Sequence, residues 1–216
     1  MPIVVTLGSA RTLGDLKARI ADEVARSDIG PQIALAIEDA ISEAAQHRFW
    51  FNEVDGVEIV LSEGISTYAT EETAALIEID AAWLDVDGQR RGLVQVPSDR
   101  MDALLEGTEA RGEPYLYSFY GDRIALHTVP DRSLSLFLKG QSRLFPLVED
   151  TQSNAWTDQG KGERYVRALA KRNLFAEVIY DMERADVQAR LADKYRDDLL
   201  AQTHSRIATG TMAAHG

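Results

Sequence analysis

Residues 160–204 carry the most regular hydrophobic pattern of the chain. Apolar residues recur there at helical spacing and would line one stripe of a helix, namely Val166, Ala170, Leu174, Val178 and Met182. Residues 187–199 repeat the period with charged residues on the other side, which is typical of a half-exposed helix. Both one helix and two helices are compatible with residues 161–204. We expect two, with a break near residues 182–186, because an uncapped helix of about 40 residues is improbable in a compact domain.

Residues 12–53 show the helical period twice. Thr12 followed by Asp15 resembles a helix-capping pair, and Pro31 suits the first turn of a second helix. The second pattern ends in the aromatic cluster of residues 49–51. A DNA-binding pair of helices is disfavoured because the surrounding Asp and Glu side chains would repel phosphate. Two packed antiparallel helices are the simpler interpretation.

From Val57 the hydrophobic period changes to two, which predicts β-strands. Asp87-Gly88 and Gly121-Asp122 predict hairpin turns. A short helix capped by Ser98 is expected over residues 97–105. One strand is expected to alternate over residues 77–83, with its apolar side formed by Ile77, Ile79, Ala81 and Trp83.

The order of these patterns predicts an α+β fold, in which a bundle of N- and C-terminal helices carries an inserted antiparallel β module. We assign residues 1–53 to the N-terminal helices, 54–149 to the β module and 150–204 to the C-terminal helices. Residues 150–162 would form a polar linker anchored by Trp156. Residues 205–216 would form a flexible tail.

Charge and composition narrow the function. The chain has 35 acidic and 23 basic residues, a net charge of −12, which disfavours a surface that wraps nucleic acid. It has no cysteine, so disulfides and thiolate sites are excluded. No stretch approaches the roughly 20 apolar residues that cross a bilayer, and no basic leader opens the chain. We expect a soluble, unprocessed protein without membrane contact.

Catalytic, cofactor and metal signatures are missing from the sequence. It contains no nucleophile elbow, His-Glu-x-x-His pair or dinucleotide glycine fingerprint. Asp85 and Asp87 fit a turn better than a calcium loop, and Glu78 with Asp80 fits a solvated strand face better than an acid–base pair. We therefore expect no enzymatic activity, no cofactor and no metal.

Six features together, in this order along the chain, resemble the head-to-tail adaptor proteins of tailed double-stranded DNA bacteriophages, also called connector or head-completion proteins. The features are residues 12–16, the helix end at residues 48–53, Pro97-Ser98-Asp99, residues 112–115, Asn154-Ala155-Trp156 and the long C-terminal helices. They span about residues 10–210.

The resemblance implies a non-enzymatic component of the virion at the head–tail junction, made in the host cytoplasm. Copies would form a ring below the portal protein, expected to be twelvefold. The ring would extend the DNA channel and attach the next tail or neck component. DNA would pass through without sequence-specific binding, and acidic channel walls would keep it from sticking.

Two other functions remain open. The β module could be an enzyme or a small-ligand or carbohydrate-binding module, favoured by Trp83 and by the tyrosines of residues 115–120. The acidity also permits a regulatory protein that docks on a basic partner. For the adaptor function, the candidate site is the tail, with Ile207 and Met212 as apolar anchors that become ordered on the portal.

Overall fold

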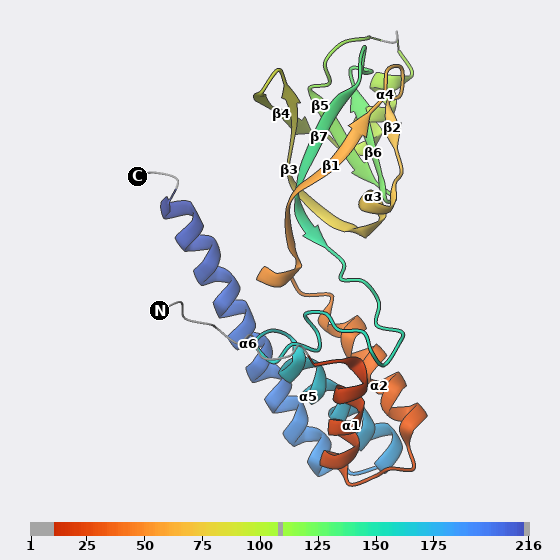
Figure 1. The fold of residues 1–216 in the computed structure, drawn as a ribbon, viewed down its shortest axis with the longest axis vertical. Helices are drawn as coiled ribbons and strands as arrows, with labels where there is room; N and C mark the ends of the chain where they lie inside the picture. Colours follow the sequence, from red (N-terminus) through yellow and green to blue (C-terminus); the bar gives the residue numbers. More distant parts are fainter. Residues whose placement is uncertain (1–10, 108–109, 214–216) are drawn as a thin grey trace, which may run out of the picture. The chain divides into compact units, whose positions relative to one another are not determined.

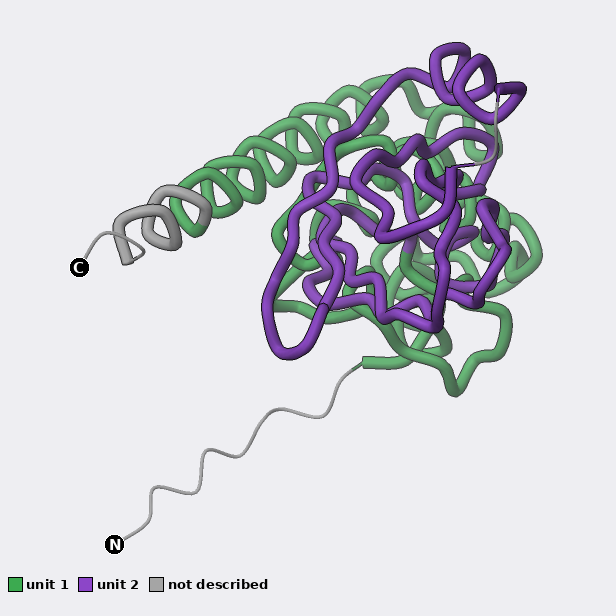
Figure 2. Tube along the Cα trace, turned by 90° about the horizontal axis from the view of Figure 1, so that it is seen from above, with its two compact units in different colours: residues 1–51, 144–216 green, residues 52–143 purple. Residues whose placement is uncertain are grey.

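The computed structural model describes residues 11–107 and 110–213, and the side chains of residues 11–206 outside that gap. The chain divides into two compact units, coloured separately in Figure 2. The helical unit comprises the described parts of residues 1–51 and 144–216, and the β unit comprises those of residues 52–143. The fold is α+β with the β unit inserted between N- and C-terminal helices, which confirms the predicted class (Figure 1).

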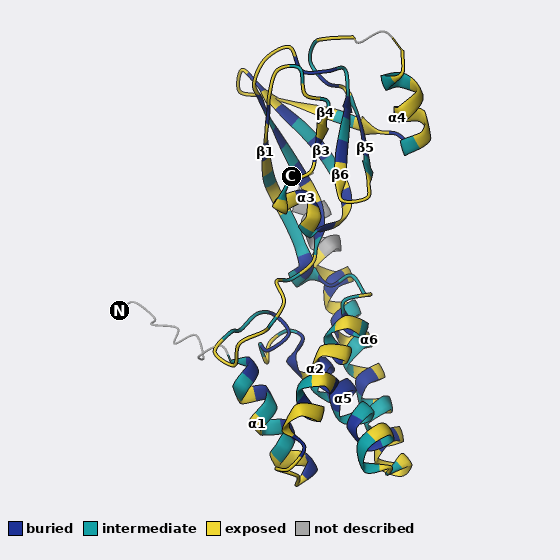
Figure 3. Cartoon of the chain, turned by 90° about the vertical axis from the view of Figure 1, so that its right-hand side faces the viewer, coloured by how far each residue is buried: buried dark blue, intermediate teal, exposed yellow. Residues whose placement is uncertain are grey.

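Four helices build the helical unit: α1 (Leu13–Val24), α2 (Gly30–Ala44), α5 (Glu163–Asn173) and α6 (Met182–Ala213). Most of the apolar residues predicted to form stripes face one common core, in which Ile20, Ile37 and Val166 are fully buried. The prediction is wrong for Met182 and Val187, which are 61% and 42% exposed, because the chain turns at Tyr180 before α6 begins. Figures 1 and 3 show α5 in the middle, with α6 on one side and α1 and α2 on the other. Burial of these stripes is the main source of helix stability here, since short helices are marginal alone.

The ends of the first two helices follow their sequence signals. Thr12 accepts a hydrogen bond from the Asp15 amide at 3.2 Å, and the Asp15 carboxylate accepts from the Thr12 amide at 2.9 Å. This reciprocal capping box confirms the predicted start of α1. Ala25 ends α1 in the left-handed region at φ 55°. Pro31 lies in the first turn of α2 as expected.

The C-terminal segment is two helices, and the break lies slightly earlier than predicted. α5 continues into a π-helical segment, Leu174–Ile179, and Tyr180 then turns left-handed at φ 59°. The Asp181 carboxylate accepts a hydrogen bond from the Arg184 amide at 3.0 Å and so caps the first turn of α6. The turn therefore falls at Tyr180–Asp181 instead of residues 182–186, because Asp181 supplies the cap that the apolar spacing did not reveal.

The backbone of α6 continues as a helix to Ala213, through most of the stretch expected to form a flexible tail. The side chains of Ile207 and Met212 lie outside the described residues. Their role as anchors therefore stays a prediction.

The β unit contains a seven-stranded sheet with the order β1-β7-β3-β4-β5-β6-β2. Its strands are β1 (Glu53–Leu61), β2 (Thr67–Tyr68), β3 (Leu76–Val86), β4 (Gln89–Gln95), β5 (Leu116–Tyr120), β6 (Arg123–His127) and β7 (Leu134–Ser142). The prediction of an antiparallel module holds for every pair except β4 and β5, which run parallel. A parallel pair needs a crossover connection, and α4 (Ser98–Leu105) lies in that connection.

Both predicted hairpin turns are present. Asp87 and Gly88, at φ 53° and 77°, join β3 to β4, and Gly121 and Asp122, at φ 58° and 60°, join β5 to β6. The predicted cap of α4 is wrong by one position. Pro97 occupies the capping position and Ser98 is the first helical residue. The structure also contains a short helix, α3 (Glu71–Ala75), which the sequence pattern did not predict.

The predicted alternation along β3 is wrong in detail because the strand is bulged. The buried residues are Leu76, Ile79, Ala82, Leu84 and Val86, whereas Ile77 is 38% exposed. Register shifts against β7 fall between Leu76 and Glu78 and between Ile79 and Ala81. Each extra residue moves the following side chains to the other face of the sheet.

Candidate functional site

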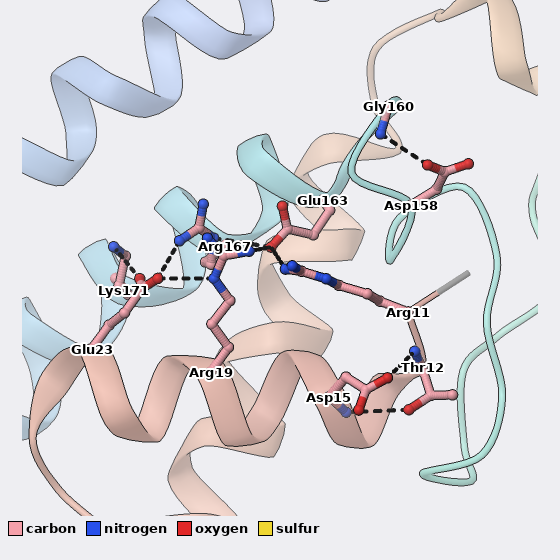
Figure 4. A network of polar contacts seen from close by, with 10 residues as sticks. All are labelled: Arg11, Thr12, Asp15, Arg19, Glu23, Asp158, Gly160, Glu163, Arg167 and Lys171. Atoms are coloured by element: carbon pink, nitrogen blue, oxygen red, sulfur yellow. Dashed lines mark hydrogen bonds and ion pairs between the residues drawn. The ribbon is translucent and has the colours of Figure 1, made fainter. Parts of the chain in front are cut away.

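A charged network joins α1 to α5 within the helical unit (Figure 4). Glu163, at the first position of α5, has only 1% of its side chain exposed. Its Oε1 lies 3.3 Å from an Arg19 guanidinium nitrogen, 3.0 Å from Arg167 Nε and 3.8 Å from Arg11. Three guanidinium groups thus surround one buried carboxylate. The positive N-terminal end of the α5 dipole also stabilises the negative charge of Glu163.

Glu23, near the end of α1, is the second centre of this network. It pairs with Lys171 at 2.8 Å, with Arg19 at 3.0 Å and with Arg167. Burial alone would raise the pKa of Glu23, but the hydrogen bond from Lys171 and the charges of Lys171 and Arg167 more than offset it, so the pKa lies below its ordinary value of 4.5. The network fixes how α1 packs on α5.

An aromatic cluster lies where the two sequence halves of the helical unit meet. Phe49 contacts the rings of Phe51, Trp156 and Tyr165, with centroids 5.4, 6.1 and 6.1 Å away. Trp156 is 2% exposed, so it does anchor the polar linker as the sequence indicated. Gly162 lies directly under this indole, and a Cβ there would come within 2.4 Å of Trp156 Cε3. The linker can enter α5 only with glycine at this point.

Trp50 and Thr203 attach α6 to the N-terminal half of the helical unit. The Trp50 backbone amide donates a hydrogen bond to Thr203 Oγ1 at 3.1 Å, and the Arg206 guanidinium lies 3.8 Å from the centre of the Trp50 indole ring. Thr203 is 3% exposed. α6 is therefore held to the bundle up to its last described side chain.

An apolar groove of about 380 Å³ opens on the α1–α2 side of the helical unit. Its walls come from α1, α2 and residues 146–148, with Leu13, Ile37, Ile41 and Leu147 among the lining side chains. Leu35 and Val148, which are 61% and 70% exposed, add apolar surface on α2 and in the loop. Exposed apolar surface of this kind is typical of protein contacts.

The aromatic residues of the β unit do not converge on one binding site. Trp83 stacks on Phe137 at 5.9 Å, and its ring is covered by the Arg90 guanidinium at 3.6 Å. Tyr117 is buried, whereas Tyr120 is 75% exposed. A pocket of about 430 Å³ in this unit is lined by residues 85–87 and 132–135, and none of these is aromatic. Among residues 52–107 and 110–143, these aromatic side chains do not form a common sugar-stacking platform.

In the described part of the chain, the titratable side chains form ion pairs and turns, and no three of His, Asp and Glu are placed to hold a metal ion. Glu78 and Asp80 are exposed on β3, and Asp85 accepts a hydrogen bond from the Gly88 amide at 2.9 Å, as a turn residue does. Within the described chain, no helix is long and apolar enough to cross a membrane.

The acidity of the chain is concentrated in residues 52–143. That segment has 17 acidic and 8 basic residues, a net charge of −9, whereas residues 1–51 and 144–216 have 18 and 15, a net charge of −3. The composition of the whole chain does not show this difference in net charge between the two units. The ion pairs of the buried Glu163 and of the partly exposed Glu23 also escaped prediction, because helical spacing marks apolar faces and gives no signal for pairs far apart in sequence.

Comparison of the sequence with models of known protein families gives a match over nearly the whole chain. The family model described as SU10 adaptor protein matches residues 11–214, which covers both units. No match to a curated protein was found.

Proposed function

This chain belongs to the SU10 adaptor protein family of phage head-to-tail adaptors, and from that premise we propose that its copies form a ring below the portal that extends the DNA channel and attaches the tail. Membership of the family gives the chain a role as an adaptor in the virion and its assembly. The ring, its position below the portal and the absence of enzymatic activity are the parts that we propose. The observation that supports the proposal is the family match, which extends over both units.

The distribution of charge supports a passive channel for DNA. The net charge of −9 on the β unit offers few cations to replace the counterions of a duplex. We propose that acids of this unit face the passing DNA and keep it from adhering. If the ring is twelvefold, as the resemblance to head-to-tail adaptors implies, twelve copies would multiply this repulsion of DNA.

The C-terminal end of α6 is the proposed portal contact. Thr203 and Arg206 hold the helix to the bundle at Trp50, so the residues beyond leave the unit from a fixed place. We propose that Ile207 and Met212 become buried against the portal or a neighbouring copy. Burying two such side chains would contribute about 3–6 kcal/mol before the cost of ordering.

The test is attachment to the cognate portal, imaged by electron microscopy. Wild-type protein mixed with portal should add a ring on the portal's channel axis, and particles with no added density would contradict the proposal. Deleting residues 207–216 should abolish attachment while leaving the thermal unfolding of the helical unit unchanged, because Thr203 and Arg206 remain. Normal attachment of this variant would reject only the docking role of Ile207 and Met212, and the proposed ring would still stand.

The alternative is a small-ligand or carbohydrate-binding β module, for which the described aromatic side chains of the β unit do not converge on one site. Saturable binding of a sugar by the isolated chain would favour that function. The acidic regulatory protein would be favoured by copurification with one basic cellular protein.

A further inference from the structure

The outward side of α2 combines one apolar residue with two negative charges. Leu35 is 61% exposed, and Glu38 and Asp39 are exposed three and four positions later, on the same helix surface. Neither carboxylate has an ion-pair partner in the described part of the chain. Glu38 also lies at the apolar groove between α1 and α2. This acidic and apolar surface, residues 35–39, is called the α2 face.

The outward side of α6 carries the opposite combination. Val187 is 42% exposed, and Arg190 and Lys194 follow it at helical spacing, on the side away from the buried Ala185, Ala192 and Leu199. Arg190 and Lys194 have no ion-pair partner among the residues that the structure describes. Exposed acids border this face, with Glu183 and Asp186 before it and Asp198 one turn after Lys194, so the positive segment is confined to Arg190 and Lys194 beside Val187. This surface, residues 187–194, is called the α6 face.

The two faces lie on opposite sides of the helical unit. α5 separates α6 from α1 and α2 in both side views (Figures 1 and 3). The faces of one copy therefore cannot contact each other. A patch on one side that matches a different patch on the other side gives head-to-tail association, which produces a closed ring when the rotation closes.

We propose that the α2 face of one copy binds the α6 face of the next copy around the ring. Val187 packs against Leu35 and the apolar groove, while Arg190 and Lys194 pair with Glu38 and Asp39. The inference rests on the proposed ring and names the contact between its subunits. Charge complementarity of this kind sets the direction of association and suppresses the reversed pairing.

Charge reversal with rescue tests the contact on portal-bound rings. Glu38→Lys with Asp39→Lys, or Arg190→Glu with Lys194→Glu, should lower ring occupancy on the portal at least about tenfold. Combining all four substitutions in one chain should restore it. Full occupancy in both double variants, or failure of the combined variant with an unchanged unfolding temperature, would overturn the contact while leaving the ring itself in place.

Cysteine cross-linking tests the same contact without the portal, since the chain has no cysteine of its own. Under oxidation at high protein concentration, the variant with Glu38→Cys and Arg190→Cys should form a ladder of covalent oligomers beyond the dimer. The variant with Glu38→Cys and Arg164→Cys is the matched control, because Arg164 is an exposed base on α5. Equal ladders in both variants, or none in the first, would contradict the contact. Wild-type protein that fails to bind portal would instead contradict the proposed function.

Discussion

Thr203 Oγ1 accepts a hydrogen bond from the backbone amide of Trp50 at 3.1 Å and donates one to the Leu199 carbonyl at 2.9 Å. One buried hydroxyl thus joins residues 153 positions apart in sequence and ties α6 to the end of the N-terminal half. This relationship sets the point from which the C-terminal residues leave the bundle.

Thr203→Val should destabilise the helical unit by about 1–2 kcal/mol, because the Trp50 amide loses its partner while the side-chain volume is kept. Thr203→Ser retains the hydroxyl and is the matched control. Chemical denaturation measures the difference. Faster amide exchange in the last turns of α6 should accompany it, and equal stability of the two variants would show that the bond contributes nothing.

Glu163→Gln should lower the free energy of unfolding by about 3 kcal/mol. This is the lower end of the range for breaking a buried ion pair, because the surrounding guanidinium groups keep some solvent contact. Glu183→Gln, an exposed change on α6, should leave stability within about 0.5 kcal/mol. Thermal unfolding of the two variants checks this. A loss for Glu163→Gln no larger than for the control would mean that the three arginines do not depend on this carboxylate.

Acid should weaken the helical unit through Glu23 and Glu43. The hydrogen bond from Arg172 holds the pKa of Glu43 below 4.5, and the pKa of Glu23 is also lowered. Because the folded values lie below the unfolded ones, this stabilisation is full above about pH 4.5 and is lost as pH falls through the lowered values. Calorimetry of Glu23→Gln should show lower stability at neutral pH, with the difference from wild type shrinking in acid. A difference that persists unchanged would contradict the mechanism.

Gly140→Ala should destabilise the β unit by about 3 kcal/mol, because the new Cβ would lie 2.0 Å from the Glu78 carbonyl oxygen at the bulge of β3. Gly92→Ala is the control, since its Cβ meets nothing within 4 Å. Denaturation followed by tryptophan fluorescence in a background with Trp50→Phe and Trp156→Phe reports on this unit through Trp83. Equal midpoints for the two variants would show that β3 and β7 can separate at the bulge without cost.

Net charge predicts weak affinity for DNA. The chain should not retard duplex DNA in a gel at physiological salt, and lowering the salt should not create tight binding, because few cations are available to release counterions. Binding that strengthens steeply as salt falls would reveal a basic surface and contradict a passive channel wall.

The sequence alone determined the kind of each main element. Periods of about four in residues 12–44 and 163–200, and of two in the strand segments between residues 57 and 138, indicate which segments are helices and which are strands, because burial of one face is what makes a helix or strand stable in a folded chain. Local turn chemistry was equally visible at Thr12, Asp87 and Gly121. These signals act over a few residues and need no knowledge of partners.

Tertiary structure decided what depends on residues far apart in the chain. The bulges of β3 arise from pairing with β7 and from the close approach at Gly140, so the strand's own alternation misassigned its faces. The parallel pairing of β4 with β5 and the four-residue charge cluster on Glu163 likewise exist only after folding. The exposure of Glu38 and Asp39 on α2 and of Arg190 and Lys194 on α6, without ion-pair partners among the described residues, is likewise a property of the folded chain, because partners far apart in sequence meet only on folding.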